Sequence, residues 1–470
     1  MLIRGGTVVT GTDERLADIL VRDGRIAEVR TTDVPPPLAG KGQGGGPDSE
    51  VIDATGLLVF PGLVDPHTHL LLDTGSARTA DDFTSGSASA AAGGVTTYLE
   101  FAPQLPGQSF LEALAARRQL MDGQSHVDYG VHLNITQLRP GWEGDLEALI
   151  DAGVTSAKIY TTYRDTIFYA DDWTWYRLMQ RSGQAGLLVQ VHAENDAIVE
   201  GMASQLRAEG KTSLRFHGQS RPPVAEAEAV ARGLVFSRQT ASPVYFVHLS
   251  TPQAVDLVAG ARREGAEAIA ETCPHYLVLD DSLYAGENAA RYAMTPPLRD
   301  ADSQAELWRR LQQGAIQAIG SDHCGFALRD RLGIDDFSRI SPGIPGVETS
   351  LLLLHTFGVK PGRLNRPDLV RLLCENPARI FGLWPRKGSL APGADADLVL
   401  FDPRPERTLS ATELHSRSGF SPYEGLSVTG KVVATILRGQ LVYRDGELIG
   451  RPGLGQFQRC ERFSWERASG

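Results

Sequence analysis

Short apolar runs recur through the middle of the chain and alternate with segments of helical pattern. The runs lie at residues 57–64, 154–160, 187–191, 243–247 and 315–320. Continuous apolar runs of this length are typical of strands that are buried on both faces of a parallel sheet. A helical pattern such as that of residues 109–117 begins with a serine, which is a good N-cap. The alternation predicts parallel strands covered by helices.

Side chains able to bind metals or act in catalysis stand at or near the ends of these runs. They are His67, His69, Lys158, His192, His248 and Asp322. In a (β/α)8 barrel the catalytic groups project from the carboxyl ends of several strands, and the barrel needs about 250 residues to close. The interval from His67 to Asp322 is of that length. The pattern therefore predicts an α/β fold with a (β/α)8 TIM-like barrel.

The two ends of the chain have a different pattern. Residues 1–59 contain short alternating strands and an Asp-Gly turn at 23–24, where glycine easily adopts the positive φ of a tight hairpin. The runs 396–401 and 432–437, followed by a second Asp-Gly turn at 445–446, repeat this pattern. We therefore predict that both ends form one small β-sandwich.

These patterns divide the chain into four parts. We expect the sandwich to use residues 1–59 and 388–450, the barrel to occupy residues 60–387, and residues 451–470 to form a C-terminal tail. The stretch 35–47 is too rich in proline and glycine to pack, so we expect a mobile surface loop without a chemical role.

Composition narrows the possible functions. A net charge of -11 and the lack of Lys/Arg-rich runs argue against nucleic-acid or anionic-membrane partners, which need clustered cations. The sequence has no secretory signal at its start and no apolar run of about 18 residues, as a membrane span would need. We expect a cytoplasmic protein that acts on a small molecule. The cysteines form no CxxC pair and are expected to be reduced: Cys273, Cys324, Cys374 and Cys460.

His67 and His69 are the strongest local metal signal. Residues i and i+2 of an extended segment point to the same side, so both imidazoles can bind one cation. An isolated His-x-His pair also arises by chance, and single histidines such as His126 and His415 are more often surface or core residues. The further histidines and the aspartate at other strand ends favour the metal interpretation.

Lys158 is unusual among these residues because an ammonium group has no lone pair and repels a dication. Burial lowers the pKa of a lysine and exposes a neutral amine, which can capture CO2 to form an anionic carbamate with two oxygens. Our hypothesis is that Lys158 is carbamylated, as N6-carboxylysine, and bridges two metals. A lysine in a salt bridge is the alternative.

Many short segments along the chain match the motifs of a known family. The chain resembles the cyclic-amide hydrolases of the amidohydrolase superfamily, specifically the hydantoinase and dihydropyrimidinase group, and it is also similar to allantoinases and dihydroorotases. The similarity spans most of the chain. It is carried by residues 65–70, 79–83, 91–96, 191–195, 221–223, 247–250, 271–277, 296–299, 320–324 and 381–385.

The resemblance implies a binuclear metal centre. Zinc is the expected ion because it suits imidazole and carboxylate ligands, although manganese or cobalt fits the same set. The expected cofactors are two divalent metal ions per subunit and the CO2 that modifies Lys158. The implied ligands are, for one metal, His67, His69 and Asp322, for the second metal His192 and His248, and for both the carbamylated Lys158.

The resemblance also implies the chemistry. A hydroxide that bridges the two metals would attack the carbonyl, because two cations lower the pKa of water. Asp322 would take its proton and return it to the departing ring nitrogen. Tyr163 would donate its hydroxyl to the oxyanion, and loss of one such donor costs about 10²–10³ in rate. The expected activity is hydrolysis of a C–N bond in a cyclic ureide or imide, such as a 5-substituted hydantoin, a dihydropyrimidine or allantoin.

Substrate binding is expected at Tyr163, which matches the group, and at Thr295 and Pro342, where this chain departs from it. Thr295 stands where hydantoinases commonly have serine, and its main chain and hydroxyl can still bind an imide. Dihydroorotases hold a substrate carboxylate with an arginine where this chain has Leu71, which favours a neutral ring. Pro342 replaces an asparagine whose main chain touches the substrate, and proline has no N–H. One hydrogen bond must therefore be absent or relocated. Position 275 is a histidine, where many hydantoinases have glutamine. In this segment the chain resembles the allantoinases instead.

Two alternatives remain. One is a dihydroorotase-like hydrolase. The other is a non-catalytic, dihydropyrimidinase-related interaction protein, in which substituted metal ligands would be expected, whereas this chain keeps all six together with Tyr163. The resemblance further implies a homotetramer.

Overall fold

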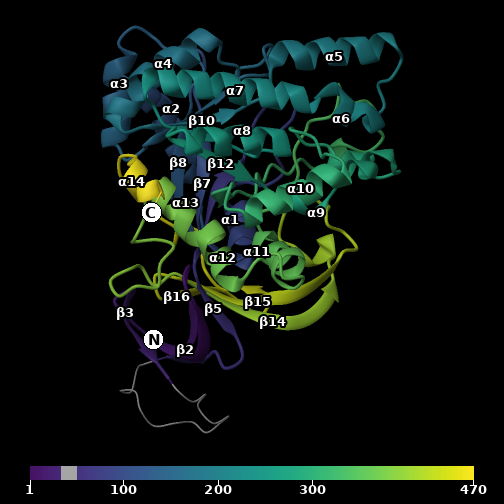
Figure 1. Cartoon of the computed structure of the whole chain (residues 1–470). Helices are drawn as coiled ribbons and strands as arrows, with labels where there is room; N and C mark the ends of the chain where they lie inside the picture. The colour runs from purple at the N-terminus through teal and green to yellow at the C-terminus, as the bar shows by residue number, and fades with distance from the viewer. Residues whose placement is uncertain (33–49, 470) are drawn as a thin grey trace.

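The computed structural model describes residues 1–32 and 50–469, so the loop predicted at 35–47 lies outside the described residues. Two sheets organise the chain: eight parallel strands form a nearly closed barrel, and nine strands form a second, mostly antiparallel sheet below it (Figure 1). The predicted fold class, a barrel with a small β unit from both chain ends, is confirmed. Among the described residues, no helix is both long and apolar enough to cross a membrane.

The barrel strands are parallel to their neighbours, and most of their residues are buried, as their continuous apolar sequences predicted. Between the first and last strands, the His69 N–H donates to the carbonyl of His323 at 2.8 Å, which nearly closes the ring. In chain order the strands are β6 (Leu63–Thr68), β7 (Val95–Pro103), β8 (Asp128–Asn134), β9 (Ser156–Tyr160), β10 (Leu188–His192), β11 (Val244–Phe246), β12 (Ala268–Thr272) and β13 (Ala318–Ile319).

Helices cover the outside of the barrel (Figure 1). The predicted N-cap is confirmed, because the Ser109 hydroxyl accepts from the Glu112 N–H at 3.2 Å and the Glu112 carboxylate accepts from the Ser109 N–H. The α-helices are α1 (Phe83–Ala92), α2 (Phe110–Met121), α3 (Trp142–Asp151), α4 (Asp172–Ala185), α5 (Asp196–Ala208), α6 (His217–Ser220), α7 (Pro223–Thr240), α8 (Pro252–Arg263), α9 (Pro274–Val278), α10 (Ala301–Gln312), α11 (Ser350–Leu354), α12 (Arg366–Val370) and α13 (Asn376–Ile380).

Shorter helical turns connect these elements. Two of them are π-helical and continue α11 and α12, at His355–Val359 and Arg371–Glu375. The 3-10 turns are Leu214–Phe216, Asp281–Ala285, Ala289–Tyr292, Leu328–Asp330 and Ala411–Glu413.

The second sheet joins the two chain ends. Its central contact is the antiparallel pair of β5 and β14, in which Val399 lies opposite Phe60. The strand order is β17-β16-β15-β14-β5-β1-β2-β3, with β4 paired to β1. The strands are β1 (Leu2–Val9), β2 (Glu14–Arg22), β3 (Arg25–Thr31), β4 (Val51–Asp53), β5 (Leu58–Pro61), β14 (Leu398–Thr408), β15 (Ser427–Leu437), β16 (Gln440–Arg444) and β17 (Glu447–Leu448).

Both predicted Asp-Gly turns are hairpins of this sheet. The turn between β2 and β3 has φ values of 50° at Asp23 and 73° at Gly24, and the turn between β16 and β17 has 52° at Asp445 and 98° at Gly446. Two consecutive positive φ values match the right-handed twist of the flanking strands, and Asp-Gly sequences adopt them at low cost.

One strand prediction is wrong. The run 57–64 was expected to be a single strand, but it forms two strands in different sheets, β5 and β6, which are separated at Gly62. A Cβ at Gly62 would lie 2.1 Å from the Thr96 hydroxyl, so only glycine allows this close approach. The apolar pattern cannot show the break, because both halves are buried.

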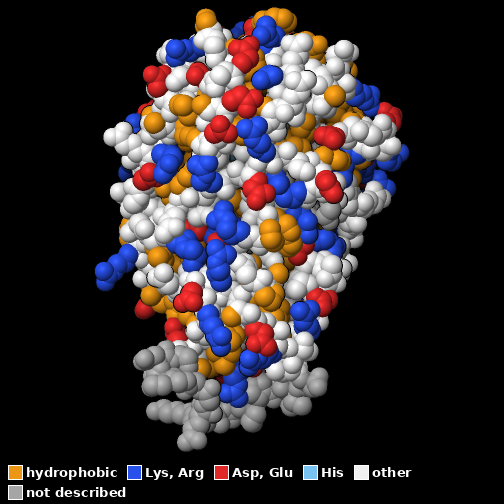
Figure 2. All heavy atoms as spheres, turned by 90° about the vertical axis from the view of Figure 1, so that its left-hand side faces the viewer, with side chains coloured by type: hydrophobic (Ala, Val, Ile, Leu, Met, Phe, Trp, Pro, Cys, Tyr) orange, Lys and Arg blue, Asp and Glu red, His pale blue; other side chains and the backbone are white. Residues whose placement is uncertain are grey.

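The C-terminal tail lies against the amino end of its own barrel. Main-chain N–H groups of the tail donate to main-chain carbonyls at or before the starts of three barrel strands: Gln458 to Tyr129 at 2.7 Å, Cys460 to Gly153 at 2.9 Å, and Phe463 to Gly186 at 2.7 Å. The last helix, α14 (Trp465–Ser469), packs beside α13 (Figure 1). On this side of the molecule, basic and acidic side chains are interspersed with apolar ones (Figure 2).

A buried ion cluster joins the barrel to the second sheet. Lys387 Nζ lies 2.6 Å from Asp128, 2.7 Å from Asp397 and 3.0 Å from Asp395, and its side chain is fully buried. Arg438 also pairs with Asp128. Although burial lowers it, the three carboxylates hold the pKa of Lys387 above its ordinary value. Lys387 thus supplies positive charge to a cluster of three carboxylates, which would otherwise be a candidate cation site.

We expect Lys387→Met to destabilise the protein by about 3–5 kcal/mol, because it leaves buried carboxylates without their cation. The denaturant midpoint of unfolding measures this. Lys211→Met is the matched control, since Lys211 pairs with Glu209 on the surface, where an ion pair contributes at most about 1 kcal/mol. Equal midpoints for the two variants would contradict the role of the cluster.

Candidate metal centre and active site

The structure brings all six predicted ligand residues together at the carboxyl end of the barrel. They come from five strands or from the residues that directly follow them: His67 and His69 from β6, Lys158 from β9, His192 from β10, His248 from β11 and Asp322 from β13. Because parallel strands all end on the same side, residues distant in sequence become neighbours there.

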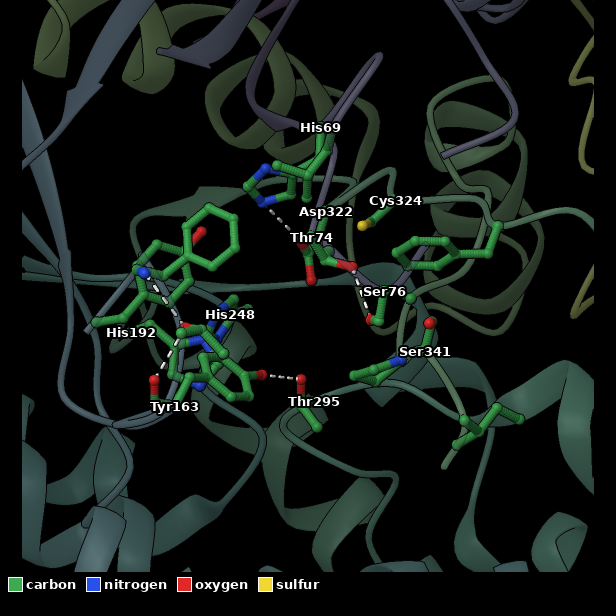
Figure 3. A pocket seen from close by; sticks show the side chains of 18 of the residues that line it. His69, Thr74, Ser76, Tyr163, His192, His248, Thr295, Asp322, Cys324 and Ser341 are labelled. Carbon is green, nitrogen blue, oxygen red and sulfur yellow. Dashed lines mark hydrogen bonds and ion pairs between the residues drawn. The ribbon is translucent and has the colours of Figure 1, made fainter. Parts of the chain in front are cut away.

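One half of the cluster contains His67, His69 and Asp322. The Nε2 atoms of the two histidines lie 3.2 Å apart, and Asp322 Oδ1 lies 3.2 Å from the first and 3.4 Å from the second. All three side chains offer a lone pair within a space that one metal ion could occupy. The orientation of His69 toward Asp322 is visible in Figure 3.

Lys158 lies inside the cluster and is completely buried. Its Nζ is 2.7 Å from His67 Nε2 and 4.3 Å from the centre of the Phe101 ring. Burial lowers its pKa to about 8, although the carboxylates of Asp322 and Glu271 oppose this shift. A minority of the amine is thus neutral near neutral pH, far more than in a lysine of ordinary pKa, and neutral amine is the form that CO2 capture requires.

The other half contains His192 and His248. Their ring centres are 4.5 Å apart, and the His248 ring also stacks on His67 at 5.4 Å. Burial lowers the pKa of all four imidazoles, most strongly at His67 and His248. Neutral imidazole is the form that binds a metal, so the protonation of the cluster fits a metal centre.

The cluster also contains unsatisfied polar atoms. Among the described residues, the buried Nδ1 atoms of His69 and His248 have no hydrogen-bond partner. Buried polar atoms are rarely left unpaired in proteins, and a bound water or ion is a usual partner for such an atom. Asp322 remains a carboxylate in this environment. Burial raises its pKa, but the neighbouring histidines hold the pKa well below the ordinary value of an aspartate.

Two glutamates that the sequence patterns did not single out orient the histidines. Glu271 accepts from His67 Nδ1 at 2.8 Å and from the His248 main-chain N–H at 2.9 Å. Glu194 lies 2.8 Å from His192 Nε2 and pairs with Arg221. A carboxylate behind a histidine fixes which ring nitrogen carries the lone pair. Glu194 could have been found from the sequence, because it lies two residues after His192. The contact of Glu271 with His67 depends on the fold and could not.

Three site residues have a left-handed backbone. Tyr163, His248 and Asp322 have φ values of 71°, 39° and 48°. Such conformations cost about 1–3 kcal/mol for residues other than glycine and concentrate at functional sites. In this chain they turn the residues that follow β9, β11 and β13 over the end of the barrel.

A cavity of about 300 Å³ opens above the cluster. The predicted substrate-binding residues Tyr163, Thr295 and Pro342 all line it, and the hydroxyls of Tyr163 and Thr295 are hydrogen-bonded (Figure 3). Burial raises the pKa of Tyr163 to about 12, so its hydroxyl is protonated and able to donate. Tyr160 and Phe168, which flank Tyr163 in the sequence, also line the cavity, whereas the neighbouring Ile167 does not.

The remaining sequence predictions fall outside this cavity. Leu71 packs against the apolar core instead of lining the cavity. His126 and His415 contact the Gly450 carbonyl and Glu348, as residues with structural roles. His275 is buried, and neither ring nitrogen has a partner among the described residues.

The fold and the site define a class, a (β/α)8-barrel protein with a histidine- and carboxylate-rich centre of the kind that holds divalent metals. The chain belongs to the amidohydrolase family, which it matches over residues 58–442. Within that family it belongs to the hydantoinase and dihydropyrimidinase group.

Its relatives are similar over nearly their whole length. The D-hydantoinase of Geobacillus stearothermophilus is 40% identical over 468 residues, 98% of this chain and 97% of that protein. The D-hydantoinase of Streptomyces coelicolor is 40% identical over 460 residues, 97% of each chain. The crystal structure of dihydropyrimidinase from Brevibacillus agri has a TM-score of 0.93 and 36% identity, and the match covers 98% of this chain and 99% of that one.

We expect Glu271→Gln to weaken metal binding about tenfold, because the neutral amide holds the imidazole of His67 less firmly than a carboxylate does. Titration of the apoprotein with Zn²⁺ against a competing chelator measures this. Glu264→Gln, at an exposed surface pair, is the control. Unchanged affinity in Glu271→Gln would show that the contact does not orient a ligand.

Proposed function

We propose that this protein hydrolyses a C–N bond of a cyclic amide, namely a cyclic ureide or imide such as a 5-substituted hydantoin, a dihydropyrimidine or allantoin. The observation that carries the proposal is the buried cluster of four neutral imidazoles, a carboxylate and a lysine of lowered pKa at the floor of a cavity that also presents a tyrosine hydroxyl. The names of its relatives support the same activity.

The residues present fit two divalent metals, with zinc as the expected ion. His67, His69 and Asp322 would hold one, and His192 and His248 the other. Two such ions lower the pKa of water and polarise a carbonyl, so they supply a nucleophile at neutral pH. We propose that Lys158 contributes a carbamate shared by both, since its neutral amine gains a negative charge and two donor oxygens by reaction with CO2.

Asp322 and Tyr163 would carry the proton and charge movements. Asp322 faces the imidazoles through Oδ1, which leaves its second oxygen to accept a proton from the attacking water and return it to the departing ring nitrogen. Without that proton the leaving group would be a poorly stabilised amide anion. Tyr163 would donate its hydroxyl to the carbonyl oxygen as negative charge develops there.

Thr295 and Pro342 would orient the ring. The Thr295 hydroxyl is the partner of the Tyr163 hydroxyl, so both can meet the same end of the substrate. Pro342 offers no N–H, and the next donor, the Gly343 N–H, is engaged by the Ala293 carbonyl at 2.9 Å. The ring must therefore be held on this side by carbonyls and hydroxyls.

We also propose that the subunits assemble into a homotetramer, which sedimentation analysis can measure.

A substrate panel tests the proposed function. We expect the zinc-loaded protein to open hydantoin, dihydrouracil or allantoin, detected by the loss of ring absorbance, and to bind about two metal ions per subunit. Preference for dihydroorotate would favour the dihydroorotase alternative. Failure to bind metal after supplementation with divalent metal and bicarbonate, together with no turnover, would favour the interaction-protein alternative.

We expect Lys158→Ala to lose metal and activity together, because the carbamate is the ligand that both ions would share. Partial rescue by a short carboxylic acid would follow if the acid replaces the carbamate in the vacated space. Metal analysis and turnover, with and without propionate, measure both effects, and Lys211→Ala serves as the control. Full metal content in Lys158→Ala would contradict the bridging role.

A further inference from the structure

The outer part of the cavity has a different chemistry from its floor. Near the cluster, the walls are largely aromatic or aliphatic, and Tyr160, Phe168 and Phe326 are all buried. Further out, polar side chains stand beside the partly exposed Leu72 and Pro342: Thr74 and Ser76 come from the loop after β6, and Ser338, Arg339 and Ser341 come from the segment before α11.

Some hydroxyls on the outer wall have spare hydrogen-bonding capacity. Thr74 Oγ1 donates to the Ala77 carbonyl at 3.0 Å and lies 3.1 Å from Ser76 Oγ. Because the Thr74 proton is used in this way, the Ser76 hydroxyl donates to Thr74 Oγ1, and Ser76 Oγ is left able to accept a hydrogen bond. The Ser341 hydroxyl makes no hydrogen bond to the described residues, so it can donate or accept. Figure 3 shows Ser76 and Ser341 on the side of the cavity opposite His192 and Tyr163.

The geometry limits what these hydroxyls can meet. The scissile carbonyl of the substrate must reach the floor, near His192 and Asp322, and a bare five- or six-membered ring does not fill a cavity of this size. A substituent on the ring would extend toward the outer wall. There, an apolar end would cover the hydroxyls without satisfying them, whereas an amide end could donate its N–H to Ser76 Oγ and accept a hydrogen bond from the Ser341 hydroxyl.

We propose that this enzyme acts on cyclic ureides whose ring substituent is a short stem ending in a carboxamide or ureido group, bound by the hydroxyls of Ser76 and Ser341. This inference rests on the proposed function. It assigns Ser76 and Ser341 as specificity-determining residues, with Arg339 as a nearby exposed cation on the same segment. The apolar walls near the cluster receive the ring and the stem.

The test compares two substrates of nearly equal shape, 5-(carbamoylmethyl)hydantoin and 5-isobutylhydantoin, with unsubstituted hydantoin as the reference. For the wild-type protein we expect kcat/KM to be about tenfold higher for the carbamoylmethyl compound, from two hydrogen bonds less the loss of apolar contact. In Ser76→Ala and in Ser341→Ala we expect this ratio to fall about threefold to fivefold.

The ratio within one variant cancels changes in folding or metal content, because both substrates meet the same enzyme. Thr412→Val, at an exposed threonine far from the cavity in sequence and outside its lining, is the control and should keep the wild-type ratio. Hydrolysis of hydantoin with an equal or higher kcat/KM for the isobutyl compound would overturn this inference alone. A ratio unchanged in both serine variants would also overturn it. Failure to open any of the three rings would overturn the proposed function and this inference together.

Discussion

Burial of basic side chains among carboxylates is the constraint on which the site depends. Four imidazoles and Lys158 meet Asp322 at the end of the barrel, where burial makes positive charge costly. Burial lowers the pKa of all five basic groups and so favours their neutral forms. The nitrogen atoms of His67, His69 and Lys158 and the carboxylate of Asp322 lie within 2.7–3.4 Å contacts, a set of donors that suits a cation. The same burial that would destabilise an ordinary core therefore prepares this one to bind metal.

The surrounding structure holds this arrangement in place at some cost. Glu271 and Glu194 fix the rings from behind, and the left-handed backbones of His248 and Asp322 turn their side chains over the barrel. At the opposite end of the barrel, Lys387 and its carboxylates join the barrel to the second sheet, while the C-terminal tail packs across the strand starts. Stability and chemistry are thus separated along the barrel axis, as is typical of this architecture.

The cavity separates its tasks in a similar way. The floor contains the groups that would move protons and stabilise charge, and they come mainly from strand ends, which are rigid. The outer wall comes from loops, which can change without disturbing the strands. Pro342 illustrates this: it offers no main-chain donor to the wall, the Gly343 N–H is satisfied by the Ala293 carbonyl, and the cluster below is complete. Substrate choice can therefore vary while the reaction type stays the same.

The sequence alone was sufficient for the barrel, the second sheet, the Asp-Gly hairpins and the grouping of the six candidate ligands, because apolar runs, turn residues and strand ends are local features. It could not show that residues 57–64 divide at Gly62, since both halves are equally apolar and the break depends on the approach of Thr96. Nor could it show the contact of Glu271 with His67, the cluster at Lys387 or the place of the tail. These depend on side chains more than a hundred residues apart, and only tertiary packing decides which of many buried charges become neighbours.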